Sequence, residues 1–362
     1  MPECRIVVAV PARDEGEGVV ATLRTLAGQR GAPPFETLLL INNSQDDTAA
    51  QARSFARQRP EFCLHVHETV LPPAEANVVG ARRAALDWAA ARAGPGGIVV
   101  STDADTWASP DWLAELLRPL LAPGSAVQAS AGRILLRAEE RAALPGPVRR
   151  THLLDTGYRD AVSRLRARVS PDPHDPAPRH WQHFGASLAL RVSAYRAAGG
   201  VPAVSCLEDL ALVRALARAD LPLRHTPRAR VYTSARLRGR VPVGLSTQLG
   251  EWQRGPEHWQ VPGGAEVLRL AQAEAALRRC WQARRSSPEM AALWLTGEAT
   301  LNAAVRAPRF GLALEQAHAA REAEGAWHRT FAPVPVQRAL QEVRALLGLQ
   351  PPQIVTARER TA

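Results

Sequence analysis

The sequence contains no lysine, so all 45 of its strongly basic side chains are arginines. Against 35 acidic residues they give a net charge of +10. An arginine guanidinium keeps its charge and binds phosphate through paired hydrogen bonds. A surplus of this size suits an anionic substrate, nucleic acid or an anionic membrane surface, and by itself it does not distinguish among them.

Long apolar runs are also missing. No stretch approaches the ~18 consecutive apolar residues of a membrane-spanning helix. The first ten residues form a short strand-like run with neither a basic segment nor a cleavage site. We therefore expect no signal peptide, and neither a secreted nor an integral membrane protein. The expected location is the cytoplasm, with peripheral contact at the inner face of the membrane left open.

Cysteine is scarce, and its four residues share no metal-ligand spacing such as C-x-x-C (Cys4, Cys63, Cys206 and Cys280). We expect buried thiols in a reducing compartment, with neither a zinc site nor a disulfide framework. The apolar fraction, 46%, and the charged fraction, 22%, are those of a folded globular protein. A chain of 362 residues is long enough for one large domain with an appendage.

The first third of the chain alternates short apolar runs with helical stretches. This alternation predicts βαβ units and a mainly parallel sheet flanked by helices, an α/β fold of Rossmann type. The expected strands are Arg5–Pro11, Thr37–Ile41, Phe62–Val66, Gly97–Thr102 and Ala126–Gly132. The expected helices end near Gly28 and Gln58, span Glu75–Arg92, and begin at Ser109, which precedes Pro110 as a helix cap would.

Further along the chain this regularity is lost. An Arg-rich, partly helical segment (Glu139–Val169) is followed by a proline-broken loop (Ser170–Arg179). A strand at Phe184–Leu190 is expected to return to the sheet, and the apolar spacing of Leu207–Ala219 predicts an amphipathic helix. From Gly263 to Leu349 the chain is expected to be mostly helical.

Polar turns follow the expected strands at one edge of the sheet. In such sheets the ligand crevice lies outside the carboxyl ends of the strands. The turns therefore place along one rim Arg13, Asp14, Glu15, Asn42, Asn43, Asp46, Asp47, Asp103 and Asp105.

The sharpest motif is Asp103-Ala104-Asp105 at the end of an apolar strand. Side chains two apart on an extended segment point the same way, so both carboxylates can reach one site. Oxygen ligands of this kind suit Mg²⁺ or Mn²⁺. The competing interpretation is a solvated turn in which aspartate bonds its own backbone.

Glu208 and Asp209 form a second acidic pair, directly before the amphipathic stripe. Acidic residues at a helix start complement the helix dipole and cap free N–H groups. The functional alternative is a general base that takes the proton of an attacking hydroxyl. The sequence leaves both open.

Three further groups have a structural and a functional interpretation. Arg236, Arg238 and Arg240 form either a solvated basic loop or a clamp on an anionic ligand. His183 is expected to be structural rather than catalytic. Trp107 and Trp112 either line a sugar site or belong to the core.

Seven motifs follow one another along the chain, in this order: VPARDEGEGV, INNSQDDT, NVVGARRAAL, STDADTWASPDWL, FGASLALRVSAYRAAGG, LEDLAL and TSARLRGR. Over residues 4–245 this series resembles a family 2 glycosyltransferase of the GT-A fold. The resemblance implies a catalytic domain at 1–245, with a nucleotide-sugar half at 1–132 and an acceptor half at 133–245. A mostly helical region at 246–362 follows it.

The resemblance also implies roles for single residues. The turn after the first strand would cradle the nucleotide, and the turn after the second strand would approach the base. In the second turn Asn42 replaces the family's usual acid, which leaves the nucleobase open because an amide also donates. Arg82 and Arg83 would approach the donor, and Gly185 would lie near the acceptor. The implied nucleotide and substrate contacts are Pro11, Ala12, Arg13, Glu15, Asn42, Asn43, Asp46, Arg82, Asp103, Ala104, Gly185 and Arg236.

For the chemistry, the resemblance implies a metal held by Asp105 and Asp103, with Asp105 the more direct ligand. It makes Asp209 the base, with Glu208 beside it. The implied activity is a metal-dependent, inverting transfer of a sugar from a UDP- or GDP-linked donor to a hydroxyl acceptor, with Mn²⁺ or Mg²⁺ as cofactor. No nucleic-acid partner is expected.

Other functions fit the residues less well. A sugar-phosphate nucleotidyltransferase would show G-x-G-x-R after the first strand, and a dehydrogenase G-x-G-x-x-G, where this chain has Pro11-Ala12-Arg13-Asp14-Glu15. The main alternative is a non-catalytic basic module, or an inactive transferase relative, that binds anions. Such a module has no use for four carboxylates on its binding rim, where they would repel phosphate.

Overall fold

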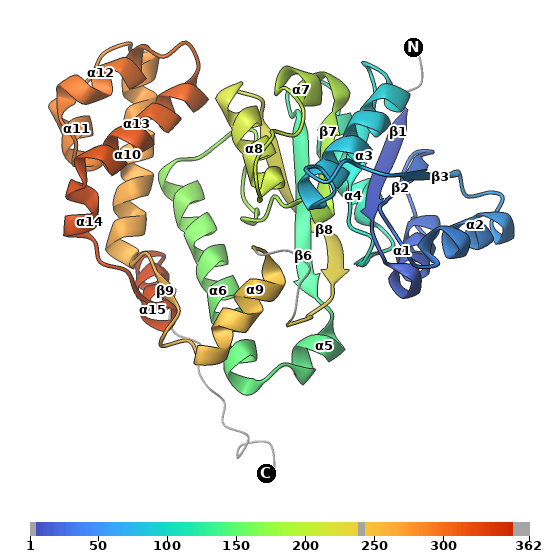
Figure 1. Ribbon diagram of the computed structural model, residues 1–362. Coiled ribbons are helices and arrows are strands. Elements are labelled where there is room, and N and C mark those ends of the chain that lie inside the picture. Colours follow the sequence, from blue (N-terminus) through green and yellow to red (C-terminus); the bar gives the residue numbers. More distant parts are fainter. Residues whose placement is uncertain (1–4, 238–242, 350–362) are drawn as a thin grey trace.

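The structure is a computed structural model that describes residues 5–237 and 243–349. At its centre is an eight-stranded sheet in the order β3-β2-β1-β4-β7-β6-β8-β5, flanked by helices (Figure 1). Its strands are β1 (Ile6–Ala12), β2 (Glu36–Asn42), β3 (Leu64–Thr69), β4 (Ile98–Ser101), β5 (Thr106–Ala108), β6 (Ala129–Leu136), β7 (Leu188–Arg191) and β8 (Leu223–Thr233). A small ribbon pairs β9 (Gln260–Val261) with β10 (Val334–Pro335).

The first half of the sheet is parallel, with β1 between β2 and β4 and with β3 outside β2. Side chains alternate across a strand, so the consecutive apolar residues of β1 enter two different cores. Ile6, Val8 and Val10 pack on one face, and Val7 and Ala9 on the other. This double burial is why the strand consists of an unbroken apolar run.

In the second half the directions mix. Strand β7 runs antiparallel to both β4 and β6, whereas β8 is parallel to β6 and antiparallel to β5. Four pairs of the large sheet are therefore parallel and three antiparallel. The predicted α/β class, a mainly parallel sheet flanked by helices, is confirmed.

Two groups of helices cover the sheet. On one face lie α1 (Gly16–Ala27), α2 (Thr48–Gln58) and α4 (Trp112–Leu121), and on the other α3 (Val78–Ala93), α7 (Val192–Ala197) and α8 (Glu208–Arg218). The remaining helices are α5 (Ala138–Ala143), α6 (Gly146–Val169), α9 (Leu245–Glu251), α10 (Gly264–Gln282), α11 (Pro288–Trp294), α12 (Glu298–Arg306), α13 (Phe310–Glu324), α14 (Ala326–Thr330) and α15 (Val336–Leu346), with 3₁₀ turns η1 (Gly185–Ser187) and η2 (Trp252–Arg254).

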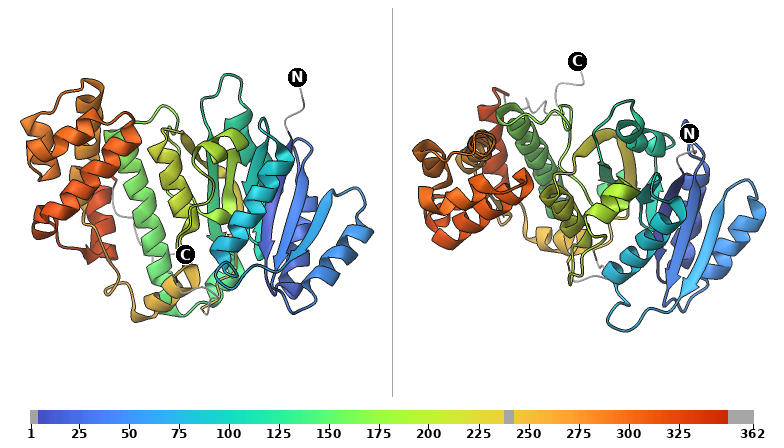
Figure 2. Two further views of the ribbon diagram at one scale, coloured as in Figure 1. Left: turned by 45° about the horizontal axis from the view of Figure 1, so that its top comes forward. Right: turned by 90° about the horizontal axis from the view of Figure 1, so that it is seen from above.

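The C-terminal part is mostly helical, as predicted, and α6 lies between it and the sheet (Figure 2). Tyr158 and Leu165 of α6 pack with Val336 and Val343 of α15. Helix α13 meets α8 through Asp220, whose carboxylate accepts the first free N–H groups of α13. Among the described residues, no helix is both long and apolar enough to cross a membrane.

Several sequence predictions are wrong in detail. Ser109 does not cap the next helix, because α4 begins at Trp112 with Asp111 before it. The sequence pattern does not predict the short strand β5, and η1 occupies the start of the expected strand at Phe184. The thiols are not buried: Cys63 is exposed, and Cys206 and Cys280 are partly exposed. Cys4 lies outside the described residues.

Candidate active site at the carboxyl ends of the strands

The turns after β1 and β2 are joined by hydrogen bonds. The Asp14 N–H donates to Ser44 Oγ at 2.9 Å, and Asp14 Oδ1 accepts the Gln45 N–H at 2.8 Å. The Gly16 N–H, at the start of α1, donates to Asp46 Oδ2 at 3.0 Å. These contacts fix the first two turns of the predicted rim relative to each other.

Asp46 is a structural link within this pair of turns. Its Oδ1 accepts both the N–H and the hydroxyl of Thr48, and the Thr48 hydroxyl accepts the Glu15 N–H at 2.9 Å. Asp46 is exposed; the desolvation that it does experience raises its pKa, but the hydrogen bonds from Thr48 and Gly16 outweigh this and leave the pKa lowered. Asp46 is therefore an ionised acceptor at neutral pH.

The two asparagines after β2 have different surroundings. Asn42 is buried, and its amide donates to Asn43 Oδ1 at 3.4 Å. Asn43 has a left-handed φ of 50°, and its side chain exchanges two hydrogen bonds with the backbone of Leu71. Asn43 thereby holds the turn after β2 against the segment after β3.

The remaining first-turn residues also lie on this rim. Pro11 and Ala12 end β1, and Ala12 is buried. Arg13 is exposed and donates to the Ala76 carbonyl at 3.0 Å, so its guanidinium reaches across to the loop before α3. Glu15 directly precedes α1.

Asp103, Ala104 and Asp105 form the turn between β4 and β5. Ala104 is buried, and its carbonyl accepts the Thr22 hydroxyl of α1 at 2.6 Å. That bond anchors the turn and leaves both carboxylates partly exposed, 33% for Asp103 and 27% for Asp105.

Asp105 is paired with Arg236, which follows β8, at 2.5 Å. Burial and then the negative charge of Asp103 raise the pKa of Asp105, while Arg236 lowers it by less. Two partly exposed carboxylates that repel each other are an oxygen donor set that suits a hard divalent cation. Arg238 and Arg240, the other arginines of this motif, lie outside the described residues.

Arg82 of α3 is buried at the centre of the acidic cluster. Its Nε donates to Glu208 Oε1 at 2.8 Å and its Nη2 to Asp103 Oδ1 at 2.8 Å. Its Nη1 donates to the hydroxyl of Ser101 at 2.9 Å. A single guanidinium thus links the D-x-D turn to the start of α8, so the acidic motifs that are far apart in sequence converge.

Asp209 lies beside this cluster with both carboxylate oxygens oriented by backbone. The Gly185 N–H donates to Oδ2 at 2.9 Å and the Leu210 N–H to Oδ1 at 2.7 Å. Burial raises the pKa of Asp209, and the nearby charge of Glu208 adds to this, whereas Arg82 and the two N–H groups lower it. The net pKa is raised, which suits a group that must accept a proton.

Glu208 and Asp209 therefore have different hydrogen-bond partners. Glu208 is 4% exposed and its carboxylate is bound by Arg82. The residue before it, Leu207, has a left-handed φ of 56°. That conformation is disfavoured for residues with a Cβ, and it marks the point where the chain enters α8. Nothing in the sequence pattern indicates this turn or the role of Ser101 as a partner of Arg82.

Other residues singled out in the sequence lie elsewhere. Arg83 donates to the Val201 and Pro202 carbonyls. Trp112 is fully buried and its indole N–H donates to the Ser187 hydroxyl at 2.8 Å, so it is a core residue. Trp107 is partly exposed, with the Arg137 guanidinium over its ring.

His183 belongs to a histidine network. It lies 3.3 Å from His225, which in turn contacts Asp175 at 2.8 Å. Burial lowers the pKa of His183 to about 4, and the pKa of the neighbouring His180 to about 3. Both are neutral at pH 7.

Two other features of the described residues are distinct from this site. Glu36, Cys63 and His65 lie together, but Arg92 and Arg5 already neutralise the Glu36 carboxylate.

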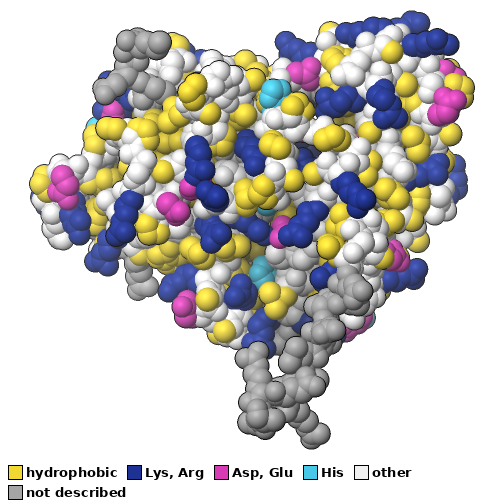
Figure 3. Space-filling view, turned by 180° about the vertical axis from the view of Figure 1, so that it is seen from behind, with side chains coloured by type: hydrophobic (Ala, Val, Ile, Leu, Met, Phe, Trp, Pro, Cys, Tyr) yellow, Lys and Arg dark blue, Asp and Glu magenta, His cyan; other side chains and the backbone are white. Residues whose placement is uncertain are grey.

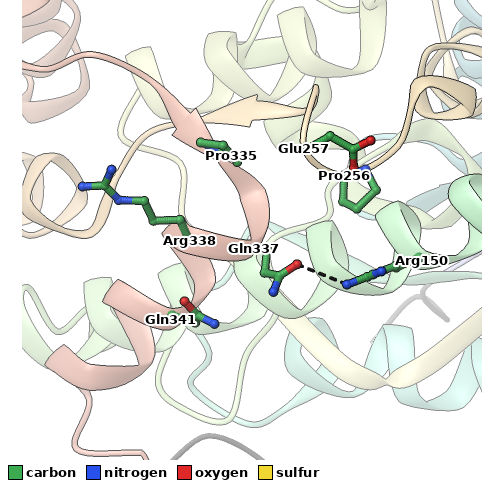
Figure 4. A pocket seen from close by; sticks show the side chains of 7 residues that line it. All are labelled: Arg150, Pro256, Glu257, Pro335, Gln337, Arg338 and Gln341. Atoms are coloured by element: carbon green, nitrogen blue, oxygen red, sulfur yellow. Dashed lines mark hydrogen bonds between the residues drawn. The ribbon is translucent and has the colours of Figure 1, made fainter.

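A cavity of about 290 Å³ opens between α6 and α15, beside β10 (Figure 4). On the face seen in Figure 3, arginines lie interspersed with apolar and acidic side chains.

Residues 7–150 match the family model described as "Glycosyl transferase family 2", which confirms the resemblance for the part of the chain that holds the first four motifs. No curated protein matches the chain. A mannosyltransferase from Pyrobaculum calidifontis, solved with GDP-Man and Mn²⁺, is 19% identical with a TM-score of 0.47, covering 94% of this chain and 86% of its own. A second similar structure is glucosyl-3-phosphoglycerate synthase from Mycobacterium tuberculosis, solved with Mn²⁺, UDP-glucose and phosphoglyceric acid. It is 19% identical with a TM-score of 0.40, and the match covers 75% of this chain and 80% of the synthase.

Proposed function

We propose that this chain, a family 2 glycosyltransferase, moves a sugar from a nucleoside-diphosphate donor to a hydroxyl acceptor by a metal-dependent, inverting displacement. The observation that carries the proposal is the convergence around Arg82. Its guanidinium bonds Asp103 of the D-x-D turn and Glu208, the neighbour of Asp209, at 2.8 Å each. The proposed metal-ligand motif and the proposed base would thus lie in one site.

The donor nucleotide would lie against the joined turns after β1 and β2. Arg13 is an exposed cation there. Asn42 is buried and the Asn43 amide bonds the Leu71 backbone, so these two residues would shape the turn that the base approaches. Arg236, which is exposed and paired with Asp105, would contact the diphosphate. The donor is expected to carry UDP or GDP.

Asp105 and Asp103 would hold Mn²⁺ or Mg²⁺. Their mutual repulsion and partial exposure fit a divalent cation, which would relieve the repulsion. When bound, the metal supplies positive charge at the departing diphosphate. Arg236 adds a second positive charge from the protein.

Asp209 would act as the general base. The acceptor oxygen forms a bond to the anomeric carbon while the bond from that carbon to the diphosphate oxygen breaks. The hydroxyl proton passes to Asp209, and the electron pair of the broken bond leaves with the diphosphate. A single displacement from the opposite face inverts the anomeric carbon. Glu208 would instead serve as the counter-charge of Arg82, whose Nε donates to it.

We propose a division of labour along the chain. Residues 1–132 would bind the donor, 133–245 would receive the acceptor near Gly185, and 246–362 would form the helical region. The proposed location is the cytoplasm, with peripheral membrane contact as the way to reach a lipid-linked acceptor.

The test is to incubate the protein with UDP- and GDP-sugars and Mn²⁺ or Mg²⁺, and to measure nucleoside diphosphate release. Asp105→Ala and Asp209→Asn should each abolish release, and chelation should do the same. Glu61→Gln, an exposed acid at the opposite edge of the sheet, is the matched control and should leave the rate unchanged. Full turnover in both site variants would overturn the mechanism. NMR of the product's anomeric proton reports inversion.

A further inference from the structure

Among the described residues, Arg82 is the arginine that is buried, at 6% exposure, and it lies between the acids of the site. All three nitrogens donate hydrogen bonds, to the α8 carboxylate of Glu208, the β4 hydroxyl of Ser101 and the turn carboxylate of Asp103. Lysine cannot replace this planar fork, because its single ammonium does not span three separate partners. The residue therefore ties three segments together in fixed geometry.

Gly185 completes the arrangement. A Cβ at this position would lie 2.4 Å from the Arg82 Cζ, so a side chain here would displace the guanidinium. The N–H of the same residue donates to Asp209 Oδ2 at 2.9 Å. The segment that packs on Arg82 is thus the segment that orients Asp209.

We infer that Arg82 is a positioning residue, not a donor contact: it locks the D-x-D turn to the start of α8 and sets the place and charge environment of Asp209. The inference rests on the proposed role of Asp209 as base. It also assigns Glu208 to the same task, as the buried counter-charge of Arg82.

The charged groups that act most strongly on Asp209 among the described residues are Arg82, from α3, and Glu208, from its own helix. From η1 it receives the uncharged Gly185 N–H. Arg82 favours the ionised form of Asp209, and Glu208 disfavours it by less. Removing Glu208 alone and removing both charges should therefore shift the titration of Asp209 in opposite directions.

The experiment titrates the metal-free protein labelled with [γ-¹³C]aspartate by NMR, with EDTA present. The Asp209 signal is assigned by its loss in Asp209→Asn. Glu208→Gln keeps the shape and a hydrogen-bond acceptor for Arg82, and should lower the Asp209 midpoint. Arg82→Met/Glu208→Gln removes both buried charges and should raise it. Each shift is expected to be about one pH unit, the size usual for one nearby charge.

Unchanged midpoints, or shifts in the same direction, would overturn the inference. If the double variant does not fold, Glu208→Gln decides alone, and a midpoint that does not fall rejects the inference. Glu61→Gln is the control and should leave the midpoint in place. The acid limb of UDP-glucose or GDP-mannose cleavage should follow the NMR midpoints. A further outcome is that the two variants shift the Asp209 midpoint in opposite directions while the wild-type protein cleaves no donor. That result would support the placement of Arg82 and reject the proposed function.

Discussion

Arg236 Nη2 lies 2.5 Å from Asp105 Oδ2, although the two residues are 131 positions apart. The pair joins the turn after β4 to the segment after β8; Arg236 is exposed and Asp105 is partly exposed. A cation that binds Asp105 must compete with this guanidinium. In the proposed function, the same guanidinium would turn to the diphosphate of the donor.

The first prediction concerns that competition. Arg236→Ala should tighten Mn²⁺ binding to the donor-free protein about two- to fivefold, the range expected for a partly exposed ion pair. Isothermal titration calorimetry measures the affinity. Arg338→Ala, which removes an exposed arginine of α15, is the control. Equal or weaker Mn²⁺ binding in Arg236→Ala would contradict the competition.

The second prediction concerns pH. Asp209 must be ionised to accept a proton, and its pKa is raised mainly by burial. Activity should therefore decline on acidification at a pH above the ordinary value of 3.8 for an aspartate. Asp209→Asn should lower kcat by about 10²- to 10⁴-fold, the usual contribution of a general base. The rate of donor cleavage against pH checks both, and an acid limb at or below 3.8 would contradict the assignment.

The third prediction concerns Gly185. Gly185→Ala places a methyl group against the Arg82 guanidinium, so it should destabilise the fold by about 1–3 kcal/mol, as overpacking does, and reduce kcat as well. Gly146→Ala is the matched control, because a Cβ there meets nothing within 4 Å. Urea unfolding and donor cleavage are the measurements. Equal stability of the two variants would argue against the close contact.

The fourth prediction concerns the attachment of the C-terminal helices. The Asp220 carboxylate caps α13 through the N–H groups of Phe310 and Gly311, at 2.9 and 2.7 Å. Asp220→Ala should lower the free energy of unfolding by about 1 kcal/mol, the usual loss for a cap. Asp220→Asn retains an acceptor and should lose less. Chemical denaturation compares the three proteins, and equal losses in the two variants would reject capping as the cause.

The fifth prediction concerns His180, whose pKa of about 3 in the folded protein lies below its ordinary value of 6.5. As pH falls below 6.5 the unfolded chain takes up a proton that the folded protein excludes, so stability is lost. Between pH 7 and 5 the loss should be about 2 kcal/mol from this residue. Urea unfolding of His180→Asn should show a smaller loss, whereas the exposed-site control His258→Gln should behave like the wild-type protein.

The local sequence pattern is enough to predict the first half of the sheet. The apolar run of β1 predicts a strand buried on both faces, and the turns after β1, β2 and β4 follow directly. The second half of the sheet is harder to predict from the sequence, because β5 and η1 are only three residues long and β5 pairs with the distant strand β8. The thiols show the same limit, since exposure depends on which distant segments cover a residue.

The order of residues by itself determined which side chains could do chemistry: the D-x-D turn at the end of an apolar strand and the acidic pair at a helix start. The residue pattern leaves the roles of Glu208 and Asp209 open, and only the family resemblance favours Asp209 as the base. Neither shows that Arg82 faces carboxylates rather than a ligand. Those choices depend on side-chain direction and on charge burial. Both arise only when α3, β4, η1 and α8 pack together, because each of these segments alone leaves its polar groups in water.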